Sequence, residues 1–325
     1  MGLVVYQVDA FTDEFGGGNK AGVVPDASRL DEKEMQKIAK ELGFSETAFV
    51  LPSKNSKSHF NIKFFTPEQE VDICGHATIG AFHVLASRGY LECNVNAQCL
   101  KNKKILIEDT NAGIFPIEIE YDNGEILNIM MTQKNPSEVF FVEDNEIEEI
   151  ASLFNIDKNN IGLKDFKCKP TCVDSSLRDL ILPINSLDSL KNMDPDFKKI
   201  IKYCEKNSIT GIHAFSLNNL NDDFEYLTTV RNFSPKIGRN EESATGISNG
   251  SLGYYLYKND ILEFDEDGIL EFNVSQGIYM NRPSKIKVIL EKKDDVLKVK
   301  VGGKSFISFE GIMKCKEQEC EIEYY

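Results

Sequence analysis

The alternation of apolar and polar residues predicts strands and helices in a similar order in both halves of this 325-residue chain. Residues 4–11, 48–51 and 60–65 place β-branched and aromatic side chains at every second position, which indicates strands. The range 31–42 instead has apolar residues at helical spacing, and Gly43 follows as a stop signal. A further helix is expected at 146–154, near a domain boundary, and further strands at 104–109, 114–121, 125–131, 286–291 and 296–301.

Three short segments of the first half recur in the second half in the same order. They are Ser45–Leu51 with Gly211–Leu217, Lys63–Pro67 with Arg231–Pro235, and Ala77-Thr78 with Ala244-Thr245. All three pairs are separated by about 167 residues, which is half the chain, so chance is a poor explanation. The repetition predicts two homologous domains that face each other across a pseudo-twofold axis.

A helix that is apolar on most sides is expected after each Ala-Thr pair, and such a helix is buried. The expected fold class is therefore α+β, with two pseudo-symmetric domains that each wrap a strongly bent, mostly antiparallel sheet around a central helix. The first domain is expected at 1–130, completed by 305–325, and the second at 131–304. The active site is expected in the cleft between them.

Composition narrows the classes of partner. The chain has 37 Lys and Arg against 52 Asp and Glu, a net charge of −15, which opposes binding to nucleic acid or an anionic membrane. No run of about 18 apolar residues occurs, and the start lacks a basic, then apolar leader, so we expect neither a membrane span nor a signal peptide. A cytoplasmic location is the simplest expectation.

Neither a metal nor a nucleotide cofactor is expected. The eight cysteines are interpreted as reduced thiols, because a cytosolic chain of this size needs no disulfides. The closely spaced pairs Cys168/Cys172 and Cys315/Cys320 have no neighbouring histidine that would complete a zinc site. The glycine cluster before Asn19 matches neither the dinucleotide-binding pattern nor the P-loop pattern.

The two halves differ in where they carry carboxylates. Glu46 lies in the first copy of one repeated segment, whereas Ile212 takes that position in the second copy. Conversely, Glu241 and Glu242 precede the second Ala-Thr pair, and no carboxylate stands there in the first half. Across a twofold cleft these positions would place one carboxyl group on each side of a substrate, which suits removal and return of a proton.

The residues before the two apolar helices predict an anion-binding site. Backbone N–H groups of Cys74–Thr78 and of Gly238–Gly246 lie at expected helix N-termini, where the helix dipole favours negative charge. A substrate carboxylate could bind there, and negative charge developing beside it would be stabilised. His76 at such a terminus suits a proton shuttle or a hydrogen-bond donor.

Each of these residues also has a structural interpretation. Glu46 could be a solvated strand-edge residue, His76 a capping or core histidine, and Glu241 and Glu242 partners of a helix dipole. Cys74 could be an inert buried thiol.

Several motifs, taken together, resemble one known family. They are Val8–Thr12, Gly18-Asn19, Ser45–Phe49, Phe65–Pro67, Glu70, Cys74–Thr78, Gln276-Gly277 and Arg282–Ser284. This set resembles the PhzF-like (phenazine biosynthesis-like) family of the diaminopimelate epimerase superfamily. The resemblance implies a diaminopimelate epimerase-like fold, a homodimer, no cofactor, and isomerisation by proton transfer, best understood for a dihydro-hydroxyanthranilate.

The resemblance also implies roles for individual residues. Glu46 resembles the family's catalytic acid/base and His76 its substrate-contacting partner, and Glu242 would assist from the other domain. The implied substrate-binding residues are Asn19, Ser45, Gly75, Ala77, Thr78, Thr245 and Gly246.

The second-half motif departs from the family pattern. Glu242 stands where the family usually has aspartate, Ser243 where it has proline, and Ile247 where it has a small polar residue. Two-thiol epimerisation is disfavoured, because no cysteine lies between Cys204 and Cys315 to oppose Cys74.

The leading hypothesis is a cofactor-independent isomerase of a small carboxylate-bearing metabolite. The alternative is a ligand-binding paralogue that retains the cleft without turnover. A purely structural or interaction protein is a third class, and it gives no reason for carboxylates at opposite positions of the repeats.

Overall fold

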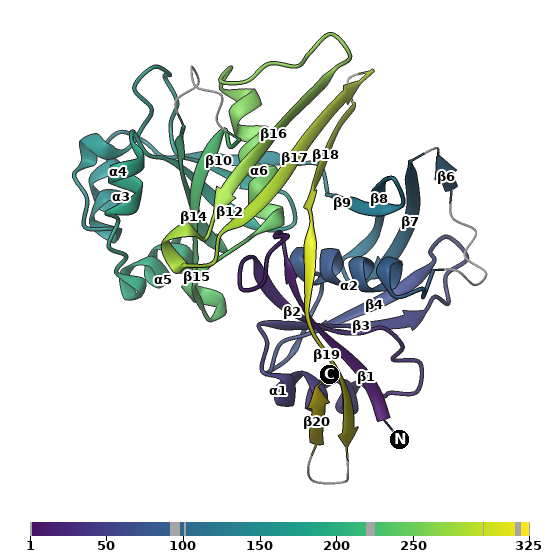
Figure 1. Cartoon of the computed structure of the whole chain (residues 1–325). Coiled ribbons are helices and arrows are strands. Elements are labelled where there is room, and N and C mark those ends of the chain that lie inside the picture. Colours follow the sequence, from purple (N-terminus) through teal and green to yellow (C-terminus); the bar gives the residue numbers. More distant parts are fainter. Residues whose placement is uncertain are drawn as a thin grey trace. The chain divides into compact units, whose positions relative to one another are not determined.

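The protein consists of two compact units (Figure 1). The computed structural model describes residues 2–91, 98–100, 102–218, 225–294, 296–315 and 320–324. The first unit comprises Met1–Thr132 and Gly302–Tyr325, and the second comprises Gln133–Val301. The domain ranges expected from the sequence differ from these bounds by two or three residues at each junction.

The first unit is one curved sheet around a helix. Its elements are β1 (Gly2–Ala10), β2 (Asn19–Val24), α1 (Glu32–Leu42), β3 (Glu46–Pro52), β4 (Phe60–Phe65), β5 (Glu70–Val71), α2 (Gly75–Ser87), β6 (Gln98–Leu100), β7 (Lys103–Thr110), β8 (Gly113–Asp122), β9 (Glu125–Thr132), β19 (Ser305–Cys315) and β20 (Cys320–Tyr324). The strands pair in the order β20-β19-β1-β2-β3-β4-β7-β8-β9. The pairs β2–β3 and β4–β7 are parallel, and the other pairs of this order are antiparallel.

The helix α2 is the core of this unit. It packs against β1, β2, β3, β9 and β19, which come from widely separated positions of the strand order, so the sheet bends around it. Small residues permit the close approach: a Cβ atom added at Gly80 would lie 3.3 Å from Cβ of Val8. The apolar circumference read from the sequence therefore corresponds to a buried helix.

The outer face of the same sheet is covered by α1. Asp31 caps this helix and forms a capping box with Glu34, and Gly43 ends it with φ of 66°. Met35 and Ile38 of the helix pack against Phe49 of β3. Since side chains alternate along a strand, Phe49 and Thr47 face α1, and Glu46 faces α2.

The second unit repeats this plan. Its elements are β10 (Ser137–Phe141), α3 (Ile147–Leu153), η1 (Lys158–Asn160), β11 (Thr171–Asp174), β12 (Arg178–Pro183), α4 (Leu187–Lys191), α5 (Phe197–Lys206), β13 (Gly211–Leu217), β14 (Thr228–Ser234), η2 (Pro235–Ile237), β15 (Arg239–Glu242), α6 (Gly246–Lys258), β16 (Ile269–Gln276), η3 (Ile278–Met280), β17 (Ser284–Lys293) and β18 (Val296–Gly303). From β11 to β17 the pairings β11–β12, β12–β13, β13–β14, β14–β16 and β16–β17 alternate between antiparallel and parallel. The series β1–β2, β2–β3, β3–β4, β4–β7 and β7–β8 shows the same alternation.

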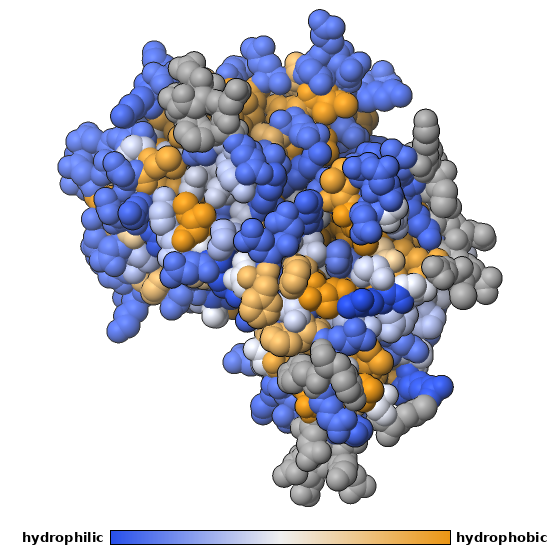
Figure 2. Space-filling view, in the orientation of Figure 1, coloured by the Kyte–Doolittle hydropathy of each residue, from blue (hydrophilic) through white to orange (hydrophobic). Residues whose placement is uncertain are grey.

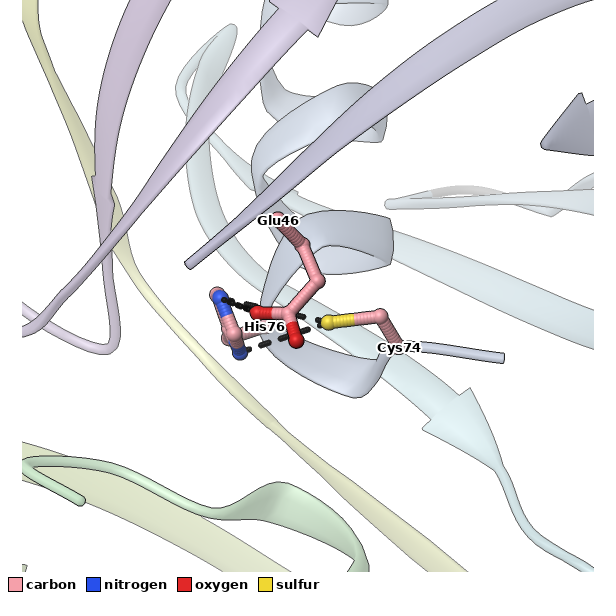
Figure 3. Close-up of side chains that lie close together, drawn as sticks. All are labelled: Glu46, Cys74 and His76. Carbon is pink, nitrogen blue, oxygen red and sulfur yellow. Dashed lines mark hydrogen bonds and ion pairs between the residues drawn. The ribbon is translucent and has the colours of Figure 1, made fainter. Parts of the chain in front are cut away.

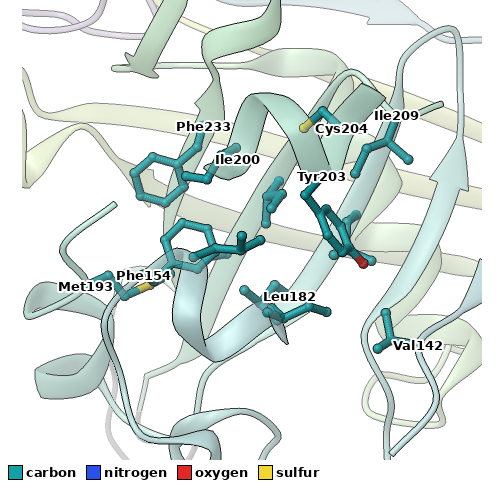
Figure 4. Packing of buried hydrophobic residues seen from close by; sticks show 14 of the residues in the cluster. Val142, Phe154, Leu182, Met193, Ile200, Tyr203, Cys204, Ile209 and Phe233 are labelled. Carbon is teal, nitrogen blue, oxygen red and sulfur yellow. The ribbon is translucent and has the colours of Figure 1, made fainter. Parts of the chain in front are cut away.

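Helices cover both faces of the second sheet. The helix α6 packs against β11, β12 and β17. On the other face, α3, α4 and α5 contribute to an apolar cluster that includes Phe154, Tyr203 and Phe233 (Figure 4). Ile212 of β13 belongs to this cluster, whereas its neighbour His213 bonds to α6 through Asn249.

The strand register corrects the alignment of the repeats by one residue. Thr47 lies opposite Phe65, and Ile212 lies opposite Phe233, so Thr47 and Ile212 occupy matching positions. Glu46 therefore corresponds to the glycine before Ile212. The carboxylate still has no counterpart in the second unit, as expected.

The N-termini of α2 and α6 show that the third repeated pair, Ala77-Thr78 with Ala244-Thr245, was aligned wrongly. Cys74 is the N-cap of α2, and Thr245 is the N-cap of α6, and each helix then runs for 13 residues. The pair Ala77-Thr78 lies inside α2, whereas Ala244-Thr245 precedes α6, so the two pairs are not equivalent. Two-residue identities carry little information, and the structural counterpart of Cys74 is Thr245.

Hydrophilic residues cover most of the face shown in Figure 2. Phe15, 65% exposed, contacts the rings of Phe306 and Phe309 on β19. Within the described ranges, no helix has the length and apolarity needed to cross a membrane.

Candidate active site

Glu46 is the first residue of β3, and its carboxylate is buried beside α2. The residue is 0% exposed. A buried carboxylate is costly unless polar groups surround it. The atom Oε2 lies 3.2 Å from Nε2 of His76, which sits in the first turn of α2 (Figure 3). The structure thus brings together the two residues expected to carry acid/base chemistry.

The imidazole of His76 has further polar neighbours at both nitrogens. Nδ1 lies 3.4 Å from Nδ2 of Asn19 and 3.4 Å from Sγ of Cys74. Nε2 lies 3.4 Å from Oγ of Ser45, whose hydroxyl also reaches the carbonyl oxygen of Lys20. The Asn19 amide can donate to Nδ1, while Nε2 faces the Glu46 carboxylate at ion-pair distance.

A tight loop positions Asn19 at the start of β2. Gly18 has φ of 61°, and a Cβ atom there would lie 2.3 Å from the carbonyl oxygen of Ala10. Only glycine satisfies both conditions without a local shift. The buried carboxylate of Asp9 accepts hydrogen bonds from Gly16 N and from Ser308 Oγ, and so ties the loop to the sheet.

The start of α2 is suited to an anion. Cys74 makes no side-chain capping hydrogen bond, and the first turn contains no acidic residue. No carboxylate of α2 itself therefore offsets the positive end of the helix dipole. Gly75, expected at the site, is the first residue of this helix.

Two other residues expected to bind substrate are fully buried. Ala77 and Thr78 are both 0% exposed. The Thr78 hydroxyl donates to the carboxyl group of Glu108 on β7, at 3.3–3.4 Å from its two oxygens. Burial raises the pKa of Glu108 to about 8, and the Thr78 hydrogen bond offsets the rise in part. The Thr78 side chain is thus committed to holding α2.

In the second unit, Glu242 ends β15 and contacts the start of α6. Its carboxylate accepts from Arg239 Nη1 and, at 2.8 Å, from the hydroxyl of Thr245. The backbone N–H of Thr245 donates to Oε1 of Gln276, and the Gln276 amide group donates to the Glu242 carbonyl. Gly246 follows as the first residue of α6. The structure thus joins Glu242, Thr245 and Gly246 as one cluster.

Glu241, in contrast, has a structural role. Both of its oxygens bind the guanidinium of Arg231, at 2.8 and 2.9 Å. The same guanidinium donates to backbone carbonyls of Leu190 and Met193. A bidentate pair with carbonyl contacts fixes α4 against β14 and leaves Glu241 out of the site.

Buried polar groups continue along α6. Ser248 donates to Asp179 of β12 at 2.5 Å, and Asn249 contacts His213. Burial raises the pKa of Asp179 to about 6, with repulsion from Glu242 adding to the rise, whereas burial lowers the pKa of His213 to about 4.

The structure places Glu46, His76, Asn19 and Ser45, which the sequence assigned to the site, close together, and adds Cys74 beside them. The N-cap position of this thiol before His76 was the available signal. Glu108 and Asp179 were missed, since nothing in their local sequence marks the buried partners they meet. For a metal, the convergent candidates among the described residues are Glu46, Cys74 and His76.

Comparisons with known proteins agree with this fold. Residues 8–311 match the family model described as phenazine biosynthesis-like protein. An uncharacterized isomerase of Clostridium acetobutylicum is 33% identical over 94% of this chain and 96% of its own length. The uncharacterized isomerase YddE of Escherichia coli K12 is 31% identical over 94% of this chain and 96% of its own length.

Solved structures give the same picture. A PhzF-family protein of Bacillus anthracis superposes with a TM-score of 0.82 and 29% identity, covering 97% of this chain and 100% of that one. A hydroxyproline epimerase of Agrobacterium vitis shares the fold, with a TM-score of 0.60 and 10% identity, covering 96% of this chain and 90% of that one. The expected α+β fold of the diaminopimelate epimerase type is confirmed, and the relatives named isomerases support an isomerase. The chain belongs to the phenazine biosynthesis-like (PhzF) family.

Proposed function

We propose that the protein is a cofactor-independent isomerase that moves a proton on a small carboxylate-bearing metabolite, with Glu46 as the acid/base. The observation that carries the proposal is the buried Glu46 carboxylate 3.2 Å from His76, beside the uncapped start of α2. The relatives are named isomerases, which supports isomerisation as the reaction class. The N-terminus of α2 supports a substrate that carries negative charge.

The proposed chemistry needs one proton to leave and one to return. The Glu46 carboxylate takes a proton from a carbon of the substrate, and the electron pair moves into the adjoining conjugated system. Backbone N–H groups at the start of α2 stabilise the negative charge that develops. The carboxylic acid form of Glu46 then returns the proton to a different carbon, so that substrate and product have the same composition. His76, 3.2 Å from the carboxylate, pairs with it and holds it in place. Positioned proton transfer of this kind contributes about 10²–10⁴-fold.

The second unit's part remains a prediction. Glu242, Thr245 and Gly246 are expected to meet the same substrate, as are Asn19, Ser45 and Gly75. A homodimer in the cytoplasm is likewise a prediction from sequence.

A ligand-binding paralogue is the second candidate, and two observations favour it. The Glu242 carboxylate is already bound by Arg239 and Thr245. Moreover, Ile247 occupies the α6 position that corresponds to His76 in α2. Under this candidate the protein binds a carboxylate ligand and exchanges no proton.

Two successive measurements distinguish the isomerase from the ligand-binding paralogue. A thermal-shift screen with small aromatic and aliphatic carboxylates identifies a ligand, since binding at 100 times Kd adds about 2.7 kcal/mol to the stability. NMR in D₂O then measures deuterium incorporation into that ligand. The isomerase proposal predicts incorporation by the wild type, its loss in Glu46→Gln, and its retention in Glu68→Gln, which changes an exposed glutamate of the same unit. Binding without any incorporation would favour the paralogue.

A further inference from the structure

Glu46, Cys74 and His76 form a convergent set of three potential metal ligands. One oxygen, sulfur or nitrogen atom from each side chain lies within 4.8 Å of the other two, and all three residues are buried. Figure 3 shows the Glu46 carboxylate and the Cys74 sulfur both directed at the His76 ring. Nothing in the reaction proposed above requires the thiol to lie there.

Rigid elements hold the three side chains. Cys74 is the N-cap of α2, His76 lies in its first turn, and Glu46 begins β3. Since α2 packs directly against β3, the distance between the carboxylate and the helix is set by the core of the unit. Ligands on a helix and a strand are held more precisely than ligands on loops.

The distances are close to those of a four-coordinate site. Zinc bonds of about 2.0–2.1 Å to nitrogen and oxygen and about 2.3 Å to sulfur, at tetrahedral angles, place N and O about 3.3 Å apart and N and S about 3.5 Å apart. In the structure, Nε2 of His76 lies 3.2 Å from Glu46 Oε2 and 3.9 Å from Cys74 Sγ. Sγ lies 3.4 Å from the other ring nitrogen, Nδ1, so metal binding through Nε2 requires the Cys74 side chain to turn toward Nε2.

The charges also match a divalent cation. The bound set would comprise one carboxylate, one thiolate and one neutral imidazole, which sum to −2 and neutralise a 2+ ion. This balance matters because an uncompensated charge is costly in a buried site. The mixture of sulfur, nitrogen and oxygen favours Zn²⁺ and similar borderline cations, whereas Mg²⁺ and Ca²⁺ prefer oxygen ligands.

We infer that Glu46, Cys74 and His76 form a binding site for a thiophilic divalent cation such as Zn²⁺, which occupies the site in place of substrate. Three protein ligands leave a fourth position for water. Asn19 lies at Nδ1 of His76, and with its side-chain amide turned so that the oxygen accepts from Nδ1–H it would orient the ring as second-shell acceptors orient metal-bound histidines. The bound cation would block proton transfer by Glu46, a consequence that rests on the proposed function. Binding of the cation does not depend on that function.

Equilibrium dialysis of the full chain tests the site. The reduced, metal-free protein is dialysed against Zn²⁺, and bound metal is counted per chain. Co²⁺ serves as a second probe, because a cobalt–thiolate bond gives a charge-transfer absorption band. The wild type is expected to bind one Zn²⁺ that Cys74→Ser and Glu46→Gln each weaken by at least about tenfold, since even outer-shell substitutions cost that much.

Cys172→Ser is the matched control, because Cys172 is also a buried free thiol but belongs to the second unit. It should retain the zinc and the cobalt–thiolate band. Should Cys74→Ser fail to fold in the presence of EDTA, Glu46→Gln decides the question alone. A wild type that binds no Zn²⁺, or variants that bind as tightly as the wild type, would overturn the site. Because no substrate is present, that result leaves the isomerase proposal standing, and a failure of deuterium exchange leaves the metal site standing.

Discussion

Glu108 gives the protein a measurable dependence of stability on pH. The carboxyl group is fully buried, and its hydrogen bond comes from the hydroxyl of Thr78 on α2. Phe115 on β8 and Phe60 on β4 lie opposite Glu108 in the sheet. In this apolar setting the protonated form is favoured, and burial raises the pKa of Glu108 from its ordinary value of 4.5 to about 8.

The sign of the effect follows from the direction of this shift. Between pH 4.5 and about 8 the folded protein keeps the proton on Glu108, whereas the unfolded chain releases it. The unfolded state therefore binds fewer protons, and stability falls as pH rises. The contribution is fully present below pH 4.5 and is lost by about pH 8. At 1.36 kcal/mol per unit, the total is up to about 5 kcal/mol, of which about 3 kcal/mol falls between pH 5 and 7.5.

Glu108→Gln removes the titration and keeps an acceptor oxygen for Thr78. Urea unfolding followed by circular dichroism, in steps from pH 5 to 7.5, gives the free energy of unfolding of both proteins. Their difference isolates residue 108, because all other titrating groups are shared. As the pH rises from 5 to 7.5, the free energy of unfolding of the variant should increase by about 3 kcal/mol relative to that of the wild type. This change is independent of any difference in stability between the two proteins at pH 5. Glu68→Gln, which changes an exposed side chain, should show no such gain. A constant difference between Glu108→Gln and wild type across the range would refute a buried, protonated Glu108.

The remaining predictions concern one buried acid and one loop. Asp179→Asn should reduce the fall in the free energy of unfolding between pH 4 and 6 by up to about 3 kcal/mol, because burial raises the pKa of Asp179 from 3.8 to about 6. Urea unfolding over this pH range measures the difference. An unchanged pH dependence would count against the pKa shift. Gly18→Ala should lower the free energy of unfolding by more than about 1 kcal/mol, because its Cβ would lie 2.3 Å from Ala10 O at φ of 61°. Gly16→Ala, with φ of 84° but no atom within 4 Å of the added Cβ, should lower the free energy of unfolding less in urea unfolding, and equal costs would rule out the steric explanation.

Local features of the fold were predictable because local sequence determines them. Helix α1 lies between Asp31 and Gly43, and both its start and its stop are chemical signals in the sequence. The repeat was also visible, and the matching series of strand pairings shows it to be real. Its alignment was wrong near α6, because a two-residue match cannot reveal which residue caps a helix. That information depends on backbone angles at Cys74 and Thr245.

The site was predictable only in part. Glu46 and His76 were identified through motifs, and they do lie together. The contact of Cys74 with His76 depends on the side-chain orientation at the helix N-cap, which the sequence does not encode locally. Glu108 was beyond reach for a different reason, because it meets Thr78 only when β7 pairs in parallel with β4.

Proton exchange by Glu46→Gln decides whether Glu46 is the base. A carboxylate ligand found by thermal shift is incubated in D₂O with the wild type or with the variant, and deuterium on its carbon atoms is counted by NMR. Circular dichroism and ligand binding confirm that the variant is folded and occupied. The account predicts incorporation by the wild type and none by Glu46→Gln, since an amide cannot take the proton. Full incorporation by the folded variant would contradict the assignment of Glu46 as the base.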